Sequence, residues 1–337
     1  MKKMIFLTMS IAIWLATSCQ VQSPPSPIET YTLVPTSTRI IPTPSVFPSS
    51  TLTTIPTLTP LPTLSPEDTI NLMQRLVQGN GTCRLPCLWG LTPGKTTPSE
   101  LNRFLEQFSN YDIQGKIFVN VNRNLAKGWG GFSFDYQEEQ IILGTGLSYY
   151  LDSEQSEINL LHIRAGALYD YGLTPDGLRD IRPIDGNDER FRSFMGQYLL
   201  PQILTNYGVP EQVLIAAFPD LLDRPDIQKQ NFSIMLIYWS QGFSVEYVSL
   251  RETLGENYAF CPSKARLSLV TWSPENPPLL EYIARMAGDE MNELNISYFK
   301  PLSGVTDLTE QEFYETFREP TYDGCLLTPA NLWPAIP

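Results

Sequence analysis

LTPGKTTPSELNRFLEQF, at residues 91–108, carries the strongest local signal in this chain of 337 residues. Thr97-Pro98-Ser99-Glu100 is a capping box with proline at the first helical position, so it predicts where a helix begins. An apolar stripe at helical spacing follows, made by Leu101, Phe104, Leu105 and Phe108. The pattern predicts an amphipathic helix that packs one face against another element.

Strands are predicted on the C-terminal side of this helix, at 116–122, 131–137, 140–151 and 157–165. The alternation of Phe132, Phe134 and Tyr136 places three aromatic residues on one face of the second strand. On the N-terminal side, Ser65 and Pro66 predict the start of a helix that runs to Gly79.

A second helix-then-strands pattern begins near Arg190. Pro201 kinks or restarts its helix, which ends before Gly208. Further strands are predicted at 212–218, 232–239, 243–250 and 266–272. Two helices close the chain, at 278–287 and 308–318, the last one capped by Asp307 with Glu310 at its third position.

The order of these elements predicts an α+β fold of antiparallel sheets with packed helices. Because the helix-then-strands order occurs twice, two tandem modules are expected, at 66–183 and 184–337. The phrase from Gly90 to Thr97 before an amphipathic helix resembles the opening of small helix-then-sheet lipoprotein modules. Outer-membrane-assembly lipoproteins and β-lactamase-inhibitor-like domains are examples, and the resemblance implies a module that binds proteins.

The N-terminus has the order of an export signal. Lys2 and Lys3 precede an apolar run, Ile5–Leu15, which is too short to span a bilayer. The ending Ala16-Thr17-Ser18-Cys19 resembles the lipobox of bacterial lipoproteins, with Ala16 where that family most often has leucine. The resemblance implies removal of residues 1–18, acylation of Cys19 and an extracytoplasmic protein anchored to the bacterial membrane. A plain signal peptide cleaved near Ser18 is the alternative.

Residues 19–65 change abruptly in composition. From Gln20 to Ser65, proline, threonine and serine dominate, and little apolar periodicity is left to bury. Such a composition predicts a disordered, extended tether that reaches at most about 140 Å at about 3.1 Å per residue. Its expected role is to hold the folded part away from a membrane.

Net charge excludes some partners. The chain carries −13, and removing the signal with Lys2 and Lys3 leaves 21 basic and 36 acidic residues, or −15. A surface of that sign repels nucleic acid and anionic lipid headgroups, so no nucleic-acid partner is expected. The acyl chains must therefore supply the attachment to the membrane.

With Cys19 acylated, an even number of cysteines remains, and in an exported chain this predicts two disulfides. The preferred pairing is Cys83–Cys87 with Cys261–Cys325, because a turn at Pro86 brings the first two together. Crossed pairings and a four-cysteine zinc site are alternatives, although the spacing does not suit a zinc knuckle.

No catalytic, cofactor-binding or metal-binding residue is predicted. His162 is the only histidine, lies in a predicted strand and needs a serine and an acid from elsewhere to form a triad. The acidic loop Asp185–Glu189 fails the calcium-loop pattern at Arg190 and Gly196. The remaining candidates are acids for glycan cleavage or tryptophans for sugar stacking, namely Asp135, Glu138, Glu139, Trp89, Trp129 and Trp239.

The sequence therefore favours a lipid-anchored module that binds a protein or an envelope polymer. An extracellular glycan hydrolase with two carboxylates in one cleft is the alternative. A passive spacer or envelope-assembly factor is a third possibility.

Overall fold

The computed structural model describes most of the chain after residue 60. The described ranges are 61–108, 111–113, 117–122, 129–138, 141–151, 157–173, 179–183, 189–217, 231–262, 265–287, 298–319 and 324–333. They belong to one compact unit, Pro56–Pro337. The predicted signal peptide, Cys19 and the tether up to residue 60 lie outside the described residues.

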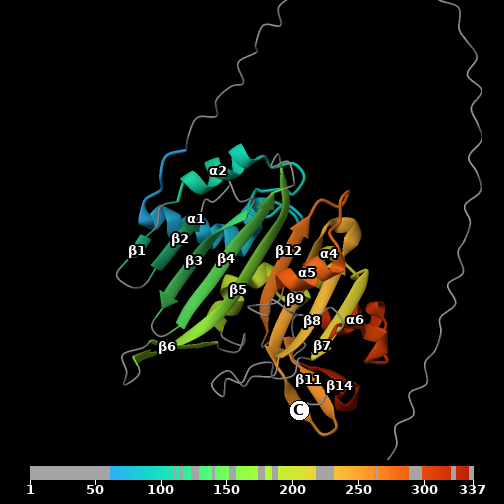
Figure 1. The fold of residues 1–337 in the computed structure, drawn as a ribbon. Coiled ribbons are helices and arrows are strands. Elements are labelled where there is room, and N and C mark those ends of the chain that lie inside the picture. The colour runs from blue at the N-terminus through green and yellow to red at the C-terminus, as the bar shows by residue number, and fades with distance from the viewer. Residues whose placement is uncertain are drawn as a thin grey trace, which may run out of the picture. The chain divides into compact units, whose positions relative to one another are not determined.

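An eleven-stranded sheet dominates this unit (Figure 1). Its strands run in the order β1-β2-β3-β4-β5-β12-β9-β8-β7-β13, with β6 paired to β5, and all the pairings are antiparallel. Their bounds are β1 Tyr111–Ile113, β2 Ile117–Asn122, β3 Trp129–Glu138, β4 Ile141–Leu151, β5 Ile158–Leu173, β6 Arg179–Pro183, β7 Gln212–Ala217, β8 Asn231–Tyr238, β9 Phe243–Leu250, β12 Arg266–Trp272 and β13 Lys300–Pro301.

A second, three-stranded sheet has the order β10-β11-β14. These strands are Glu252–Leu254, Asn257–Phe260 and Leu326–Pro329. The Cys261–Cys325 disulfide continues the pairing of Phe260 with Leu326, so it fastens the end of β11 to the start of β14.

The α-helices begin where local sequence supplies their caps. They are α1 Pro66–Gly79, α2 Pro98–Glu106, α3 Glu189–Phe194, α4 Leu200–Tyr207, α5 Leu280–Ala287 and α6 Glu310–Phe317. Ser65 caps α1, and Thr97 forms the predicted capping box with Glu100 at the start of α2. Both predictions are confirmed, and each cap satisfies a backbone N–H that has no partner within its helix.

The main core lies between one face of the large sheet and helices α1 to α4. Met73 of α1, Leu105 of α2 and Ile203 of α4 are fully buried in one cluster with the sheet residues Phe134 and Leu236. Burying each such side chain contributes about 1.5–3 kcal/mol.

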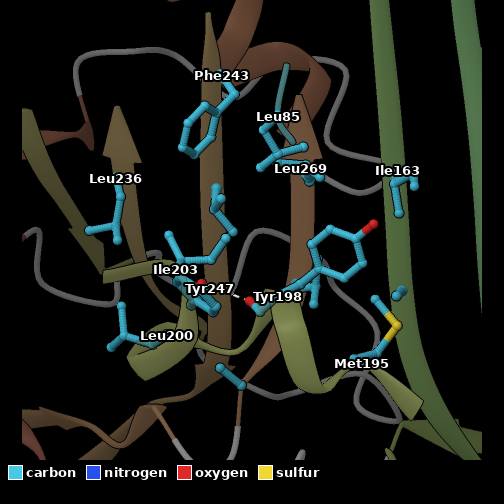
Figure 2. Packing of buried hydrophobic residues seen from close by; sticks show 14 of the residues in the cluster. Leu85, Ile163, Met195, Tyr198, Leu200, Ile203, Leu236, Phe243, Tyr247 and Leu269 are labelled. Carbon is cyan, nitrogen blue, oxygen red and sulfur yellow. Dashed lines mark hydrogen bonds between the residues drawn. The ribbon is translucent and has the colours of Figure 1, made fainter. Parts of the chain in front are cut away.

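Figure 2 shows Leu200 and Ile203 of α4 beside Leu236 and Tyr247 of the sheet. The buried Tyr247 hydroxyl donates a 2.8 Å hydrogen bond to the backbone oxygen of Tyr198. This bond satisfies a polar group inside the core, where an unpaired hydroxyl would be costly.

Helix α5 packs on the opposite face of the same sheet. Ile283 and Ala284 are buried there against Leu160 of β5 and Trp272 of β12. Leu267 and Leu269 of β12 belong to the main core, whereas Val270 and Trp272 belong to the cluster under α5. The period-two alternation of the strand thus supplies both cores.

The predicted α+β class is confirmed, because helices pack on antiparallel sheets. The predicted modules, 66–183 and 184–337, contribute neighbouring parts of one sheet, which is continuous where β5 pairs with β12. The boundary between two modules stays a prediction, and residues 184–188 lie outside the described part.

Several local predictions were wrong in detail. Helix α6 is capped by Thr309 with Glu312, not by Asp307 with Glu310. Strand β5 continues to Leu173, beyond its predicted end at residue 165, because its outer half pairs with β6. Strands β1, β6, β10, β11, β13 and β14 were not predicted.

The cysteine pairing follows the preferred prediction. Cys83 and Cys87 form one disulfide, with their Cα atoms 5.8 Å apart, and Cys261 and Cys325 form the other, with Cα atoms 4.2 Å apart. The four-cysteine zinc alternative is therefore wrong for this structure.

We predict that the two disulfides stabilise the fold unequally. Chain entropy predicts a loss of about 4 kcal/mol for C261S/C325S, whose bond joins residues 64 apart, and about 2 kcal/mol for C83S/C87S, whose bond joins residues 4 apart. Urea unfolding of both double variants and the parent chain measures these losses. Equal losses would contradict the loop-length account.

Candidate functional site

One face of strands β3, β4 and β5 is only half-buried, so it is partly accessible to solvent. Along β4, Leu143, Thr145, Leu147 and Tyr149 are buried, and the residues between them are not. Helices α1 to α4 pack on the buried side. The accessible residues, which we call the open face, are Gly131, Ser133, Gly144, Gly146, Ser148, Tyr150, Arg164 and Gly166.

Two glycines of the open face, Gly146 and Gly166, are not required by the backbone. A Cβ on Gly146 would lie 3.8 Å from the backbone oxygen of Phe132, and one on Gly166 would lie 3.6 Å from the Arg266 side chain. Both are ordinary contacts, and neither glycine has a positive φ. Glycine inside a strand weakens it and often marks a close approach by another molecule or backbone.

The open face ends in an apolar and aromatic patch at the start of α5. Leu279 is 75% exposed and Tyr282 is 37% exposed. The Tyr282 ring stands edge-on to Tyr150 of β4, with centroids 6.3 Å apart. Burial, with Tyr282 adding to its effect, raises the pKa of Tyr150, so its hydroxyl stays neutral and able to donate.

A buried polar row adjoins the open face on strands β5, β12, β9 and β8. His162 Nε2 lies 2.8 Å from Ser268 Oγ, and Ser233 donates a hydrogen bond to Glu246. His162 and Glu246 are each 2% exposed. Ser268 of β12 is paired with Glu246 on β9, the strand on one side, and with Arg164 on β5, the strand on the other side.

This row contains the residue types of a hydrolytic triad without its arrangement. In a triad, the acid contacts the ring nitrogen that does not face the serine. Here the strand of Ser268 lies between the strands of His162 and Glu246, so the acid lies on the serine side. Ser268 is also only 5% exposed, which leaves little access for a substrate.

His162 is held in its neutral form. Burial, reinforced by the positive charge of Arg164, lowers the pKa of His162 to about 3. In a neutral imidazole, one nitrogen donates a hydrogen bond and the other accepts one. The Ser268 hydroxyl, which can do either, is the partner of Nε2. The histidine thus has a structural role, because it links β5 to β12 through a buried hydrogen bond.

A separate hollow of about 660 Å³ opens beside helices α3 and α4. Its described lining mixes polar and apolar groups, and consists of Glu189, Arg192, Ser193, Gly196, Leu199 and Gln202. Glu189 is the single carboxylate among these described lining residues, which thus contain no acid pair of the kind that a glycoside hydrolase uses.

The other sequence candidates are scattered. Trp89 is 3% exposed and belongs to the main core. Trp239 was expected inside a strand, but it lies in the turn after β8. It is half-buried, and the centroid of its ring lies 5.5 Å from that of Trp272. Asp135, Glu138 and Trp129 lie in β3, and their side chains are outside the described residues, as are Glu139 and the loop 185–188.

Sequence reasoning missed the open face. Its signal is the segment LGTGLSYY at 143–150, in which small residues alternate with larger ones. That alternation predicts a strand but does not show which strands lie beside it or whether a helix covers it. Tyr150 and Tyr282 are brought together only by the fold.

The described part of the chain contains no cluster of His, Cys, Asp or Glu side chains able to hold a metal ion. None of the described helices combines the length and apolar character needed to cross a bilayer. Comparisons with protein-family models, curated proteins and solved structures find no match to this chain.

We predict that the free energy of unfolding depends on His162 at mildly acidic pH. The unfolded chain protonates its histidine near pH 6.5, whereas the folded chain does so only near pH 3. Stability present above pH 6.5 is therefore lost as the pH falls, at a rate approaching about 1.4 kcal/mol per pH unit.

Urea unfolding between pH 5 and 6.5 measures this slope, and His162→Gln removes it while keeping a polar partner for Ser268. As this histidine is the only one, NMR titration of the imidazole reports its pKa without ambiguity. A value near 6.5 in the folded protein would contradict the prediction.

Proposed function

We propose that this protein is an extracytoplasmic lipoprotein, anchored through Cys19, whose folded unit binds an envelope polymer. The anchor rests on the basic start, the apolar run and the Ala16–Cys19 ending of the sequence. A Pro/Thr-rich tether before Pro66 gives the folded unit room to reach a partner away from the membrane.

The open face and its aromatic end are the observation that carries the binding proposal. A sheet face made of glycine and serine has low relief, so a long, flat ligand is able to lie against it. Tyr150, Tyr282 and Leu279 extend this surface with apolar area at one end. Exposed aromatic rings with a polar edge are typical of binding surfaces.

A polyhydroxylated, uncharged polymer fits this chemistry best. The hydroxyls of Ser133, Ser148 and Tyr150 both donate and accept hydrogen bonds, as sugar hydroxyls do. Arg164 is the one charged residue among the described side chains of the open face, and the chain as a whole is strongly acidic. That acidity disfavours strongly anionic polymers. A protein ligand remains the other outcome of the binding test.

The hydrolase alternative is not favoured by any feature of the described residues. It requires two carboxylates about 5–10 Å apart in one cleft. Among the described lining residues of the hollow beside α3, Glu189 is the only carboxylate, and Glu246 is only 2% exposed.

We predict that Cys19→Ser releases the protein from the membrane. Acyl chains on Cys19 would hold the parent in the membrane fraction, because two or more chains anchor a protein stably. Detergent phase partitioning of cells that express each form measures the difference, and mass spectrometry of the N-terminal peptide identifies the lipid. A parent protein found entirely in the aqueous phase would contradict the anchor.

We predict that Gly146→Gln weakens binding to neutral polysaccharide at least tenfold without destabilising the fold. The new side chain would project from the open face, where its Cβ meets only an ordinary contact. Gly79→Gln is the matched control, because a Cβ at Gly79 meets no atom within 4 Å and Gly79 lies in α1, away from this face.

A second pair compares exposed leucines, with Leu279→Ser expected to weaken binding and Leu254→Ser, on β10, expected to leave it unchanged. Affinity electrophoresis in gels containing purified neutral or anionic polysaccharides measures all four variants. Equal retention of the open-face and control variants would refute this binding surface. Capture of one stoichiometric protein, sensitive to the same variants, would replace the polymer with a protein ligand.

A further inference from the structure

The Cys83–Cys87 disulfide lies in an accessible loop directly after α1. Both of its cysteines are half-buried. In the other disulfide, Cys325 is half-buried as well, and Cys261 is only 5% exposed. Thiol–disulfide exchange requires a thiolate to reach one of the two sulfur atoms, so Cys83–Cys87 offers two routes of attack and Cys261–Cys325 offers one.

Asn80 fixes the shape of this loop from inside. Its side-chain amide donates hydrogen bonds to the backbone oxygens of Cys83, at 2.9 Å, and Cys87, at 2.8 Å. Its side-chain oxygen accepts a 2.9 Å bond from the N–H of Trp89. Asn80 is itself 2% exposed, so these bonds are shielded from water.

The end of α4 fastens the loop from the other side. The Tyr207 hydroxyl accepts a 3.1 Å hydrogen bond from the N–H of Leu85, whose side chain is 5% exposed in the main core. Arg84 donates a 2.7 Å bond to the backbone oxygen of Asn206, and its guanidinium lies 4.9 Å from the centroid of the Tyr207 ring. None of these contacts involves a sulfur atom.

We propose that Cys83 and Cys87 form a reversible thiol–disulfide exchange site. Because the loop is held by Asn80, Leu85 and Tyr207, its shape does not depend on the sulfur–sulfur bond. The reduced thiols would stay close together, at positions whose Cα atoms are 5.8 Å apart in the disulfide form. Such preorganisation keeps the effective concentration of one thiol at the other high, and so favours closure of the bond.

The reductant of this site is a dithiol. One thiolate of the dithiol attacks Sγ of Cys83 or Cys87, forms a mixed disulfide and displaces the other cysteine as a thiolate, which takes up a proton. The second thiol of the dithiol then resolves the mixed disulfide. The protein disulfide gains two electrons and two protons, and the dithiol becomes a disulfide.

In the reduced state, the backbone oxygen of Asn80 lies ready to accept a hydrogen bond from Cys83. The Cys83 Sγ is 3.1 Å from that oxygen in the structure. The thiol form would therefore gain a partner at the place where the sulfur already lies, with no rearrangement of α1 or of the loop.

The test titrates the folded full-length protein with dithiothreitol. Free thiols are alkylated at each concentration, and peptide mass spectrometry quantifies all four cysteines while tryptophan fluorescence follows the fold. We expect Cys83–Cys87 to be reduced at least tenfold faster than Cys261–Cys325 at each concentration, with unchanged fluorescence, because access to sulfur governs the rate of exchange. Simultaneous reduction of both disulfides, or reduction that coincides with unfolding, would overturn the proposal.

Two variants test the role of the loop contacts. Asn80→Ala removes three hydrogen bonds, and Tyr207→Phe removes one while keeping the ring. We expect reoxidation of the reduced pair by oxidised glutathione to slow at least fivefold in Asn80→Ala and by a smaller factor in Tyr207→Phe. If Asn80→Ala does not fold, Tyr207→Phe alone decides. Parent-like rates in every folded variant would show that these contacts do not preorganise the thiols.

Discussion

The antiparallel pairing of β5 with β12 is the constraint on which the rest of the fold depends. It joins residues far apart in the chain, such as His162 and Ser268, which are separated by 106 positions. Without it, the strands before β6 and the strands after α4 would form two sheets with open edges, and the main core would be divided. Helix α5 also depends on this seam, since it covers Leu160 of β5 and Trp272 of β12 together. Closing so long a loop costs conformational entropy, and this cost is offset only when both faces of the sheet are packed.

The polar side chains at this seam make its register specific. A shift of one residue would turn every side chain of β12 to the opposite face, bringing Ser268 into the main core and Leu269 out of it. Ser268 would then lose His162, and the buried Glu246 and Ser233 would face an apolar strand. Buried polar groups that must find one another penalise such alternatives more strongly than apolar residues do. Burial in this row, with the nearby positive charge of Arg164, keeps the histidine neutral by lowering its pKa.

Local sequence was sufficient for elements whose ends are defined by their own caps, and insufficient where two caps compete. Ser65 and Thr97 are each followed by a proline and, three residues later, by an acid, and both helices begin as predicted. Near α6, both Asp307 and Thr309 are followed three residues later by glutamate. The structure selects Thr309 because the N–H of Leu308 already donates to the Thr306 hydroxyl, which keeps the preceding residues out of the helix.

The open face escaped prediction for a different reason, since the pairing of Tyr150 with Tyr282 depends on strand order and on where α5 docks. The disulfide pairing was within reach of the sequence, because short spacing left Cys83 and Cys87 as natural partners.

The way the chain enters α1 determines how this unit would respond to mechanical force. For a chain held at its N-terminal end, tension is applied at Leu64 and Ser65, where a backbone bond from Leu64 to Gln107 ties the entry to the end of α2. Such a load peels α1 from its first turn, breaking helical bonds one after another, and does not shear the large sheet along its strands. Peeling would proceed towards Asn80, where the amide bonds and the Cys83–Cys87 loop form the first strong obstacle. The region after α1 would thus limit extension under tension, and the sheet that bears the open face would keep its shape while part of the first helix unwinds.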